Sequence, residues 1–189
     1  TVHTESRTKR RSFIDMADVY YSYKPKELTH EMLFFVLEKY YGITADENSL
    51  SFNENGKPYL VSGELFFNIT HTKGLIMIAV SKNEVGMDAE NFAEKKVNFE
   101  GIAKKYFSEA EREQIKNERH FFTLWTKKES VIKYAGKTLA KNLKTTTFKG
   151  ETPTGDPAYE GANTKSYLLS DHVYSITSKD PEHKVIFLI

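Results

Sequence analysis

The sequence predicts an α+β fold in which most strands pair antiparallel. The predicted elements run helix, strands, helices, strands, without the regular strand–helix–strand alternation typical of a parallel sheet. A helix followed by strands occurs twice, which allows two similar halves, although no clean sequence repeat is found. The 189 residues, 39% hydrophobic and 28% charged, suffice for one substantial domain or for two small lobes that share a core.

A helical pattern opens the first half, between Thr29 and Tyr41. The apolar residues on its predicted inner face are Met32, Leu33, Val36, Leu37 and Tyr40. We expect Thr29 to cap the start of this helix and Gly42 to end it. Asn55 to Pro58 predict a turn, because Asn-Gly and Lys-Pro both resist regular structure. Three strands are expected next, at residues 65–69 (ending at Thr70 and His71), 75–81 and 84–90.

Helices and then strands are expected in the second half. Residues 102–107 read as a helix, and Ser108 with Glu111 forms a capping-box pattern for another. A long helix is predicted from Phe121 to Tyr134, ending near Gly136. The expected strands are residues 145–148, 166–169, 173–176 and 185–189, and glycine and proline mark residues 150–161 as a loop.

Bulk composition excludes several classes of protein. The net charge is +1, so no overall attraction to nucleic acid or anionic lipid is expected. The chain has no cysteine, which excludes disulfides and thiolate chemistry. No stretch approaches the length of a membrane helix, and no signal-peptide pattern occurs, so we expect a cytoplasmic protein. Basic residues gather locally at Arg7, Lys9, Arg10 and Arg11 despite the near-neutral total charge. This cluster is either a solvated terminus or a contact for phosphate or nucleic acid.

Two pairs of charged residues could carry chemistry. Asp88 and Glu90 are two apart on a predicted strand, so their carboxylates share one face and would suit Mg²⁺, although a solvated strand end is the commoner reading. Glu129 and Lys133 are four apart on the long helix. They are either a surface ion pair worth about 0.3–0.5 kcal/mol, or a metal ligand or general base beside a phosphate-binding cation. His71 and Lys57 could each donate hydrogen bonds to a phosphate.

Four ordered segments give these residues a more specific context. They are Gly56-Lys57-Pro58, Phe67-Asn68-Ile69-Thr70-His71, Val85-Gly86-Met87-Asp88-Ala89-Glu90 and Trp125-Thr126-Lys127-Lys128-Glu129-Ser130-Val131-Ile132-Lys133. Together they resemble the phosphopantetheinyl transferases of the surfactin-synthetase-activating type, over about residues 24–140. Thr70 stands where that family usually has serine, and Gly136-Lys137-Thr138-Leu139 departs from its G-K-G-L. No strand is predicted before residue 24, where the family leads us to expect some.

The resemblance implies an enzyme of the holo-[acyl-carrier-protein] synthase type. It would transfer 4'-phosphopantetheine from coenzyme A to a serine of an acyl or peptidyl carrier protein, with Mg²⁺, and release 3',5'-ADP. The implied fold has two similar halves with pseudo-twofold symmetry, residues 1–81 and residues 82–189, the second carrying the metal and catalytic motifs. Coenzyme A would lie between them, and the protein would act as a monomer.

The resemblance also implies roles for individual residues. Asp88, Glu90 and Glu129 would bind the metal, and Glu129 would take the proton of the carrier serine. Lys133 would neutralise phosphate charge. Thr70 and His71 would contact the phosphates or the 3'-phosphate end of coenzyme A, with His71 counted among the catalytic residues. Lys57 would contact the nucleotide and Lys26 its 3'-phosphate. Candidate docking charges for the carrier are Lys104, Lys105, Lys127 and Lys128, with a solvated helix face as the alternative.

Three alternatives remain open at this stage. The first is a non-catalytic coenzyme A or nucleotide-binding protein of the same fold. The second is a small nucleic-acid-binding domain, for which the near-neutral charge and the lack of a reading motif are unfavourable. The third is a Mg²⁺-dependent phosphodiesterase that uses the same acidic residues and releases free phosphopantetheine.

Overall fold

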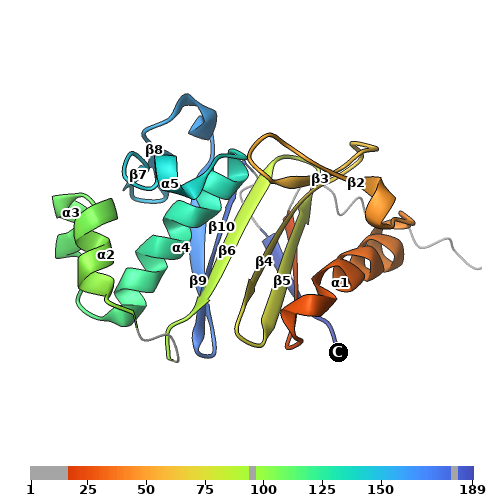
Figure 1. Ribbon diagram of the computed structural model, residues 1–189, viewed down its shortest axis with the longest axis horizontal. Helices are drawn as coiled ribbons and strands as arrows, with labels where there is room; N and C mark the ends of the chain where they lie inside the picture. Colours follow the sequence, from red (N-terminus) through yellow and green to blue (C-terminus); the bar gives the residue numbers. More distant parts are fainter. Residues whose placement is uncertain (1–16, 94–96, 180–182) are drawn as a thin grey trace, which may run out of the picture.

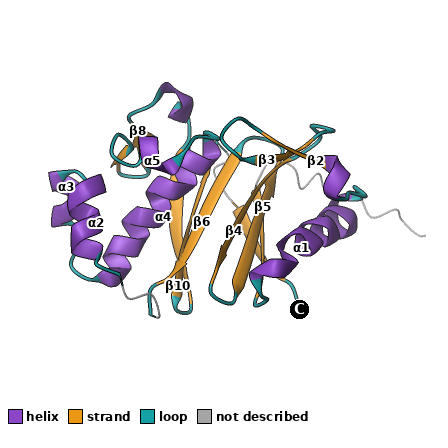
Figure 2. Cartoon of the chain, in the orientation of Figure 1, coloured by secondary structure: helices purple, strands orange, loops and turns teal. Residues whose placement is uncertain are grey.

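The structure, a computed structural model, describes residues 17–93, 97–179 and 183–189. The basic cluster at Arg7, Lys9, Arg10 and Arg11 lies outside these residues. Two sheets form the middle of the described part, with helices on the outer sides (Figures 1 and 2), which confirms a mixed α+β fold. None of the described helices is long and apolar enough to cross a membrane.

The first sheet has the strand order β11-β1-β5-β4. Its strands are β11 (His183–Phe187), β1 (Ala17–Ser22), β5 (Leu75–Ser81) and β4 (Phe66–Thr72). β1 pairs parallel with β11, whereas β1 with β5 and β5 with β4 pair antiparallel. The last described strand of the chain therefore returns to the sheet in which the first one lies.

The second sheet is entirely antiparallel, with the order β6-β10-β9. It contains β6 (Val85–Asn91), β10 (His172–Ser178) and β9 (Asn163–Leu169). Two short antiparallel hairpins lie outside the sheets: β2 (Leu50–Phe52) with β3 (Pro58–Leu60), and β7 (Thr147–Lys149) with β8 (Thr152–Thr154). Antiparallel pairing is thus the rule, as the sequence predicts.

The helices are α1 (Thr29–Val36), α2 (Phe99–Tyr106), α3 (Glu109–Glu113), α4 (Glu118–Tyr134) and α5 (Leu139–Asn142). A π-helical turn, Leu37–Tyr41, extends α1 to Gly42, whose left-handed backbone (φ 72°) ends it as predicted. Short 3₁₀ turns occur at Lys26–Leu28, Glu47–Ser49 and Pro157–Tyr159. The capping box of Ser108 and Glu111 at the start of α3 is confirmed.

Two details at the start of the chain differ from the sequence prediction. Thr29 is not the helix cap, because the 3₁₀ turn before it already winds the backbone; Thr29 is the first helical residue, and its hydroxyl donates to the carbonyl of Lys26. A strand, β1, does lie before residue 24. It was not predicted because its side chains are buried on both faces of a central strand, so no polar–apolar alternation marks it.

Three apolar clusters connect the layers. The first packs α1 on one face of the first sheet, through residues such as Leu33, Val36 and Ile78. The second joins the other face of that sheet to β6 and β10, through residues such as Met77 and Met87. The third packs α2 and α4 together against the second sheet. Figure 1 accordingly shows α1 and α4 on opposite outer sides of the strands.

β4 and β6 face each other where the two sheets meet, and side chains connect them in place of a backbone ladder. Asn68 Oδ1 accepts a hydrogen bond from the backbone N–H of Met87 at 2.7 Å. Thr70 Oγ1 accepts from the N–H of Ala89 at 3.3 Å. These contacts satisfy edge N–H groups of β6 and fix its register against β4.

α4 lies unusually close to the second sheet. A Cβ atom added at Gly86 would stand 2.1 Å from the carbonyl oxygen of Ser130 and 2.2 Å from the nitrogen of Tyr134, so only glycine fits there. Two rows of hydroxyl groups, buried except at Ser166, complete the contact: Thr126–Ser175–Ser166 and Ser130–Thr177–Thr164, each step 2.8–2.9 Å long. This packing fixes the position of α4 along β6.

Candidate active site

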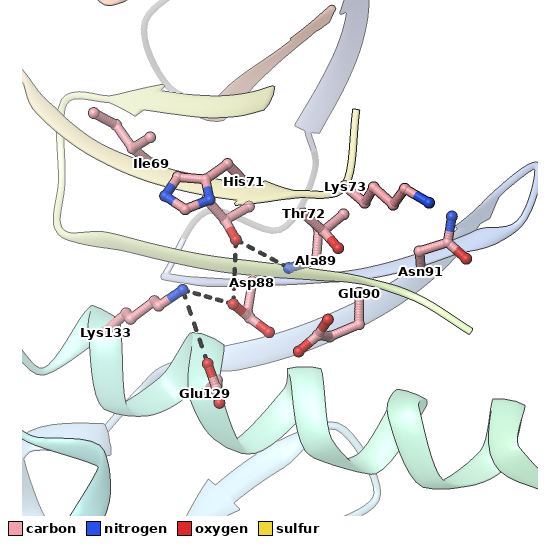
Figure 3. A pocket seen from close by; sticks show the side chains of 11 residues that line it. Ile69, His71, Thr72, Lys73, Asp88, Ala89, Glu90, Asn91, Glu129 and Lys133 are labelled. Carbon is pink, nitrogen blue, oxygen red and sulfur yellow. Dashed lines mark hydrogen bonds and ion pairs between the residues drawn. The ribbon is translucent and has the colours of Figure 1, made fainter. Parts of the chain in front are cut away.

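A cavity of about 550 Å³ opens where β4, β6 and α4 come together. Its lining is mostly polar and comes from all three elements (Figure 3): Ile69, Thr70, His71, Thr72, Lys73, Asp88, Ala89, Glu90, Asn91, Glu129 and Lys133. The structure therefore brings together six of the eight site residues predicted from the sequence: Thr70, His71, Asp88, Glu90, Glu129 and Lys133.

Three carboxylates meet in this cavity. On β6, Met87 and Ala89 point into the core between the sheets, so Asp88 and Glu90 occupy the opposite face, the one on which α4 packs. Glu129 faces them from α4 (Figure 3). The three residues are only 4%, 9% and 9% exposed, respectively. Acidic groups so crowded and so poorly hydrated are unfavourable unless a proton or a cation neutralises them.

Lys133 supplies part of that neutralisation. Its Nζ lies 2.6 Å from Asp88 Oδ1 and 4.0 Å from Glu129 Oε2. Burial disfavours the charged form of Lys133, but the attraction of Asp88, Glu129 and Glu90 outweighs it, so the pKa of this ammonium is raised. The sequence offered an exposed ion pair of Glu129 with Lys133 as one interpretation; the structure shows instead a buried cluster in which Lys133 pairs most closely with Asp88.

One lysine does not balance three carboxylates. Burial, followed by the charge of Asp88, raises the pKa of Glu129 to about 8, although Lys133 acts in the opposite direction. Asp88 Oδ2 is buried and has no hydrogen-bond partner among the described residues. A buried carboxylate oxygen without a partner is costly, and a bound cation would remove that cost.

This donor set fits a magnesium ion better than a metal that needs a complete protein cage. Within the described part of the chain, no group of three or more His, Cys, Asp or Glu side chains is arranged to hold a metal ion. Mg²⁺ does not require a complete cage, because it commonly takes one or two carboxylates and completes its shell with water and substrate phosphate. Asp88, Glu90 and Glu129 offer only oxygen ligands, and Asp88 Oδ2 has no competing hydrogen bond in the described residues.

Thr70 and His71 lie at different depths on β4. Thr70 is buried, and its hydroxyl donates to Asp88 Oδ1 at 3.2 Å while accepting from the N–H of Ala89. Because a hydroxyl has one proton, that proton is committed to Asp88 in this structure. His71 is exposed at the cavity wall, where a bound ligand could reach it.

Lys26 and Lys57 lie outside the cavity. Lys26 lines a neighbouring cavity of about 490 Å³, which shares Ile69 and His71 with the first and also contains His30. Lys57 lines neither of the two. Its ammonium donates to Glu84 Oε2 and to the carbonyls of Val85 and Tyr134. The structure thus leaves Lys26 in the neighbouring cavity and Lys57 at the wall of a third one, of about 270 Å³, with its ammonium bonded to the protein itself.

Three of the four candidate docking lysines have contacts within the molecule, the first being Lys105, which lies over the ring of Tyr106. Lys128 is fully buried and forms a 2.9 Å ion pair with Glu111, so it cannot dock a carrier protein. Lys127 donates to the carbonyl of Gly150 and lies over the ring of Phe148. The helix α4 therefore uses successive residues for different contacts: Thr126 for the sheet, Lys127 for the β7–β8 hairpin, Lys128 for α3 and Glu129 for the cavity.

Sequence reasoning assigned no role to Asn68, Thr72, Lys73 or Asn91. Asn68 fastens β4 to β6, and the other three line the cavity. Strand periodicity held a partial signal, because Asn68, Thr70 and Thr72 are two apart and so share one face of β4.

Comparison with known proteins connects this geometry to a family. A family model described as the 4'-phosphopantetheinyl transferase superfamily matches residues 84–181, just over half of the chain. The chain belongs to this superfamily. The matched region contains Asp88, Glu90, Glu129 and Lys133, whereas Lys57, Thr70 and His71 precede it.

Individual relatives agree with that assignment. A 4'-phosphopantetheinyl transferase of Bacillus subtilis is 32% identical over 150 residues, covering 75% of this chain and 63% of the relative. The 4'-phosphopantetheinyl transferase gsp of Aneurinibacillus migulanus is 34% identical over 142 residues, covering 70% and 56%. The 4'-phosphopantetheinyl transferase Sfp of Bacillus subtilis strain 168 is 30% identical over 149 residues, covering 75% and 63%. The chain spans less than two thirds of the length of these curated relatives.

Proposed function

We propose that this chain transfers the 4'-phosphopantetheine group of coenzyme A to a serine of an acyl or peptidyl carrier protein and releases 3',5'-ADP. The observation that supports this best is the meeting of Asp88, Glu90, Glu129 and Lys133 in one cavity. These residues come from a strand and a helix almost 40 positions apart, and they are four of the six charged residues of the two motifs that the matched family region contains. Membership of the superfamily and the names of the relatives point to the same reaction.

Magnesium is part of the proposal. Asp88, Glu90 and Glu129 would hold it, since they provide crowded oxygen ligands and a carboxylate oxygen that has no partner in the described residues. When bound, the ion would neutralise these carboxylates and the diphosphate of coenzyme A and so favour the departure of 3',5'-ADP. Positioning and charge neutralisation account for most of the catalysis in transfers of this kind.

The side chains of the chain divide the remaining work. The hydroxyl oxygen of the carrier serine attacks the phosphorus that bears the pantetheine arm, and Glu129 takes the proton of that hydroxyl. The bond from this phosphorus to an oxygen of 3',5'-ADP breaks, and 3',5'-ADP leaves. Lys133, already at the carboxylate cluster, neutralises charge on the phosphates. His71, exposed at the wall, donates a hydrogen bond to a phosphate oxygen. Thr70 orients Asp88 by donating a hydrogen bond to its carboxylate.

The neighbouring cavity gives the nucleotide end of coenzyme A a place to lie. It shares Ile69 and His71 with the first cavity and is also lined by Lys26, Glu27, His30 and Glu47, of which His30 and Glu47 lie 2.9 Å apart. A 3'-phosphate would find the ammonium of Lys26 there. In this proposal Lys26 has the role that the resemblance implied, at the 3'-phosphate end of coenzyme A.

We also propose a pseudo-twofold relation between residues 1–81 and residues 82–189, in a monomeric, cytoplasmic protein. Each half has a helix on the outer face of its sheet, α1 on the first and α4 on the second (Figure 1). The halves meet at β4 and β6, where the cavity opens. β11 crosses from the second half to pair with β1 in the first sheet.

Mass spectrometry of an apo carrier protein tests the reaction. We expect the carrier to gain the mass of phosphopantetheine when the chain, coenzyme A and Mg²⁺ are present, and not when Mg²⁺ is removed by chelation. Glu129→Gln should lower the rate on the order of 100-fold or more, since one positioned acid–base group contributes that much. Glu113→Gln, an exposed glutamate in α3, is the matched control and should transfer normally.

Each other result has a distinct meaning. Coenzyme A that binds without ever modifying a carrier, across a panel of apo carriers, would indicate the non-catalytic binding protein. Release of free phosphopantetheine without a carrier would indicate the phosphodiesterase. Normal turnover by Glu129→Gln would refute the role of Glu129 as the base.

A further inference from the structure

The turn between β2 and β3 rests on the C-terminal end of α4. The side-chain amides of Asn53 and Asn55 both donate to the carbonyl of Gly136, each at 3.0 Å. The same Asn53 also organises the turn, because its Oδ1 accepts from the N–H groups of Asn55 and Lys57. A segment of the first sheet's half thus caps the helix that carries Glu129 and Lys133. Gly136 lies two residues after the end of α4, so these bonds hold the residue at which the chain leaves the helix.

Lys57 extends this contact to a second element. Its Nζ donates to the carbonyl of Tyr134 at 3.2 Å, to the carbonyl of Val85 at 3.2 Å and to Glu84 Oε2 at 2.7 Å. The side chain of Lys57 is only 14% exposed, whereas that of Glu84 is 49% exposed. The two hydrogen bonds to carbonyls are therefore shielded from solvent, whereas the ion pair with Glu84 lies at the surface.

The two carbonyls belong to the two elements that carry the proposed magnesium ligands. Val85 begins β6, three residues before Asp88, and Tyr134 ends α4, directly after Lys133. Along a strand, three residues span about 10 Å, so Lys57 is too far from Asp88 to contact it. It can still set the spacing of β6 and α4 at this end, and that spacing determines how Asp88 and Glu90 face Glu129.

We infer that Lys57 is a positioning residue that holds β6 and α4 at the separation the magnesium site requires, and that its side chain does not read the nucleotide. This inference rests on the proposed function. It differs from the role that the resemblance implied, in which Lys57 contacts coenzyme A directly. The two roles predict opposite kinetic effects, because a lost ligand contact raises KM, whereas a displaced catalytic group lowers kcat.

The experiment compares Lys57→Met with wild type and with two controls. Lys82→Met removes an exposed lysine elsewhere, and Glu84→Gln removes the ion pair but leaves both carbonyl contacts of Lys57 in place. Three quantities are measured for each: the Kd of Mg²⁺ by calorimetry, the Kd of 3',5'-ADP without metal, and kcat and KM for coenzyme A. Thermal unfolding reports stability separately.

For Lys57→Met we expect the Kd of Mg²⁺ to rise and kcat to fall, each about tenfold, as for supporting residues around a metal site. The Kd of 3',5'-ADP and the KM for coenzyme A should change less than about twofold. Both controls should stay near wild type. Lys57→Arg, which keeps the charge and the donors, should recover most of the Mg²⁺ affinity and of kcat.

Several outcomes would overturn the inference. Weaker 3',5'-ADP binding and a raised KM with an intact kcat would show that Lys57 contacts the nucleotide. If Lys57→Met lowers the melting temperature but leaves the Mg²⁺ affinity and kcat unchanged, Lys57 stabilises the fold without positioning the magnesium site. A wild-type chain that binds Mg²⁺ but modifies no carrier would refute the proposed function alone, since the effect of Lys57→Met on Mg²⁺ affinity still decides the inference. Failure of the wild type to bind Mg²⁺ would refute both.

Discussion

The hydroxyl of Thr70 shows how one small side chain can serve fold and site together. It accepts from the N–H of Ala89, which helps to join the two sheets, and donates to Asp88, which orients a proposed magnesium ligand. Serine, the residue usual in the family at this position, has the same donor and acceptor. The departure at Thr70 therefore preserves the chemistry that the structure uses.

This dual role makes Thr70→Val informative, because valine has nearly the same shape but no hydroxyl. We expect the free energy of unfolding to fall by about 1–3 kcal/mol, since the buried N–H of Ala89 loses its side-chain partner and Asp88 Oδ1 keeps only Lys133 among its described partners. The affinity for Mg²⁺ should fall as well. Chemical denaturation and calorimetry measure the two effects. Thr70→Ser, which keeps the hydroxyl, is the control. If Thr70→Val and Thr70→Ser have the same stability and the same Mg²⁺ affinity, the hydroxyl contributes to neither quantity.

Much of the site could be predicted from the sequence because its key pairs are local. A separation of two on a strand places Asp88 and Glu90 on one face, and a separation of four on a helix does the same for Glu129 and Lys133. Their meeting could not be derived from spacing, because it depends on the close approach of α4 to Gly86. The position of Lys57 was unpredictable for a related reason: two of its three acceptors are backbone carbonyls, which leave no mark in the sequence.

At the scale of elements, α4 is held on two sides. The hydroxyl rows fasten it to the second sheet, and Lys128 fastens it to its helical neighbours on another side. Lys128 Nζ pairs with Glu111 Oε2 and donates to the carbonyls of Tyr106, at the end of α2, and Leu143, after α5. Glu129, the next residue, then extends into the cavity.

The ion pair of Lys128 and Glu111 should be costly to break but tolerant of joint replacement. Lys128→Met leaves a carboxylate buried and unpaired, and we expect a loss of about 3–5 kcal/mol in the free energy of unfolding. Adding Glu111→Gln removes that charge while an amide oxygen can still accept from the N–H of Ser108, so most of the loss should be recovered. Urea denaturation of both single variants and the double variant gives the coupling. Simple additivity of the two losses would contradict this account.

Element prediction succeeded where local chemistry is distinctive and failed where tertiary burial decides. Gly42 and the Ser108–Glu111 capping box end and begin helices by backbone rules that neighbours do not alter. β1 and the short strands β2, β3 and β8 were missed, and β8 lies within residues 150–161, which the sequence marked as a loop. β1 is buried on both faces, and three-residue strands carry too little pattern to separate them from turns. Lysine is seldom buried, so the burial of Lys128 could not be foreseen from its type.

At the scale of the whole molecule, the cavity lies at the boundary between the two sheets, where β4 and β6 form no backbone ladder. The two sheets are joined by the apolar layer between them, by the side chains of Asn68 and Thr70, and by the turn that carries Lys57. The carboxylates of Asp88, Glu90 and Glu129 repel one another beside this boundary. Their protonation and their ligand should therefore influence the stability of the entire fold.

The sign of that influence follows from the pKa of Glu129, which is raised from an ordinary 4.5 to about 8 in the folded protein. Below pH 4.5 both the folded and unfolded states hold the proton, and the stability associated with neutral Glu129 is fully present. As the pH rises from about 4.5 to about 8, the unfolded state has released the proton while the folded state retains it, so this stability is lost progressively. The slope is on the order of 1 kcal/mol per pH unit for one such group.

Mg²⁺ should reverse this loss, because a cation neutralises the same carboxylates without a proton. We expect the melting temperature without metal to fall between pH 6 and pH 8, and added Mg²⁺ to raise it more at pH 8 than at pH 6. Thermal unfolding at both pH values, with and without Mg²⁺, measures this. In Glu129→Gln the contribution of Glu129 to the pH dependence disappears, so the curve of the variant without metal should be flatter than that of the wild type. Parallel curves would show that the ionisation of Glu129 is not linked to folding.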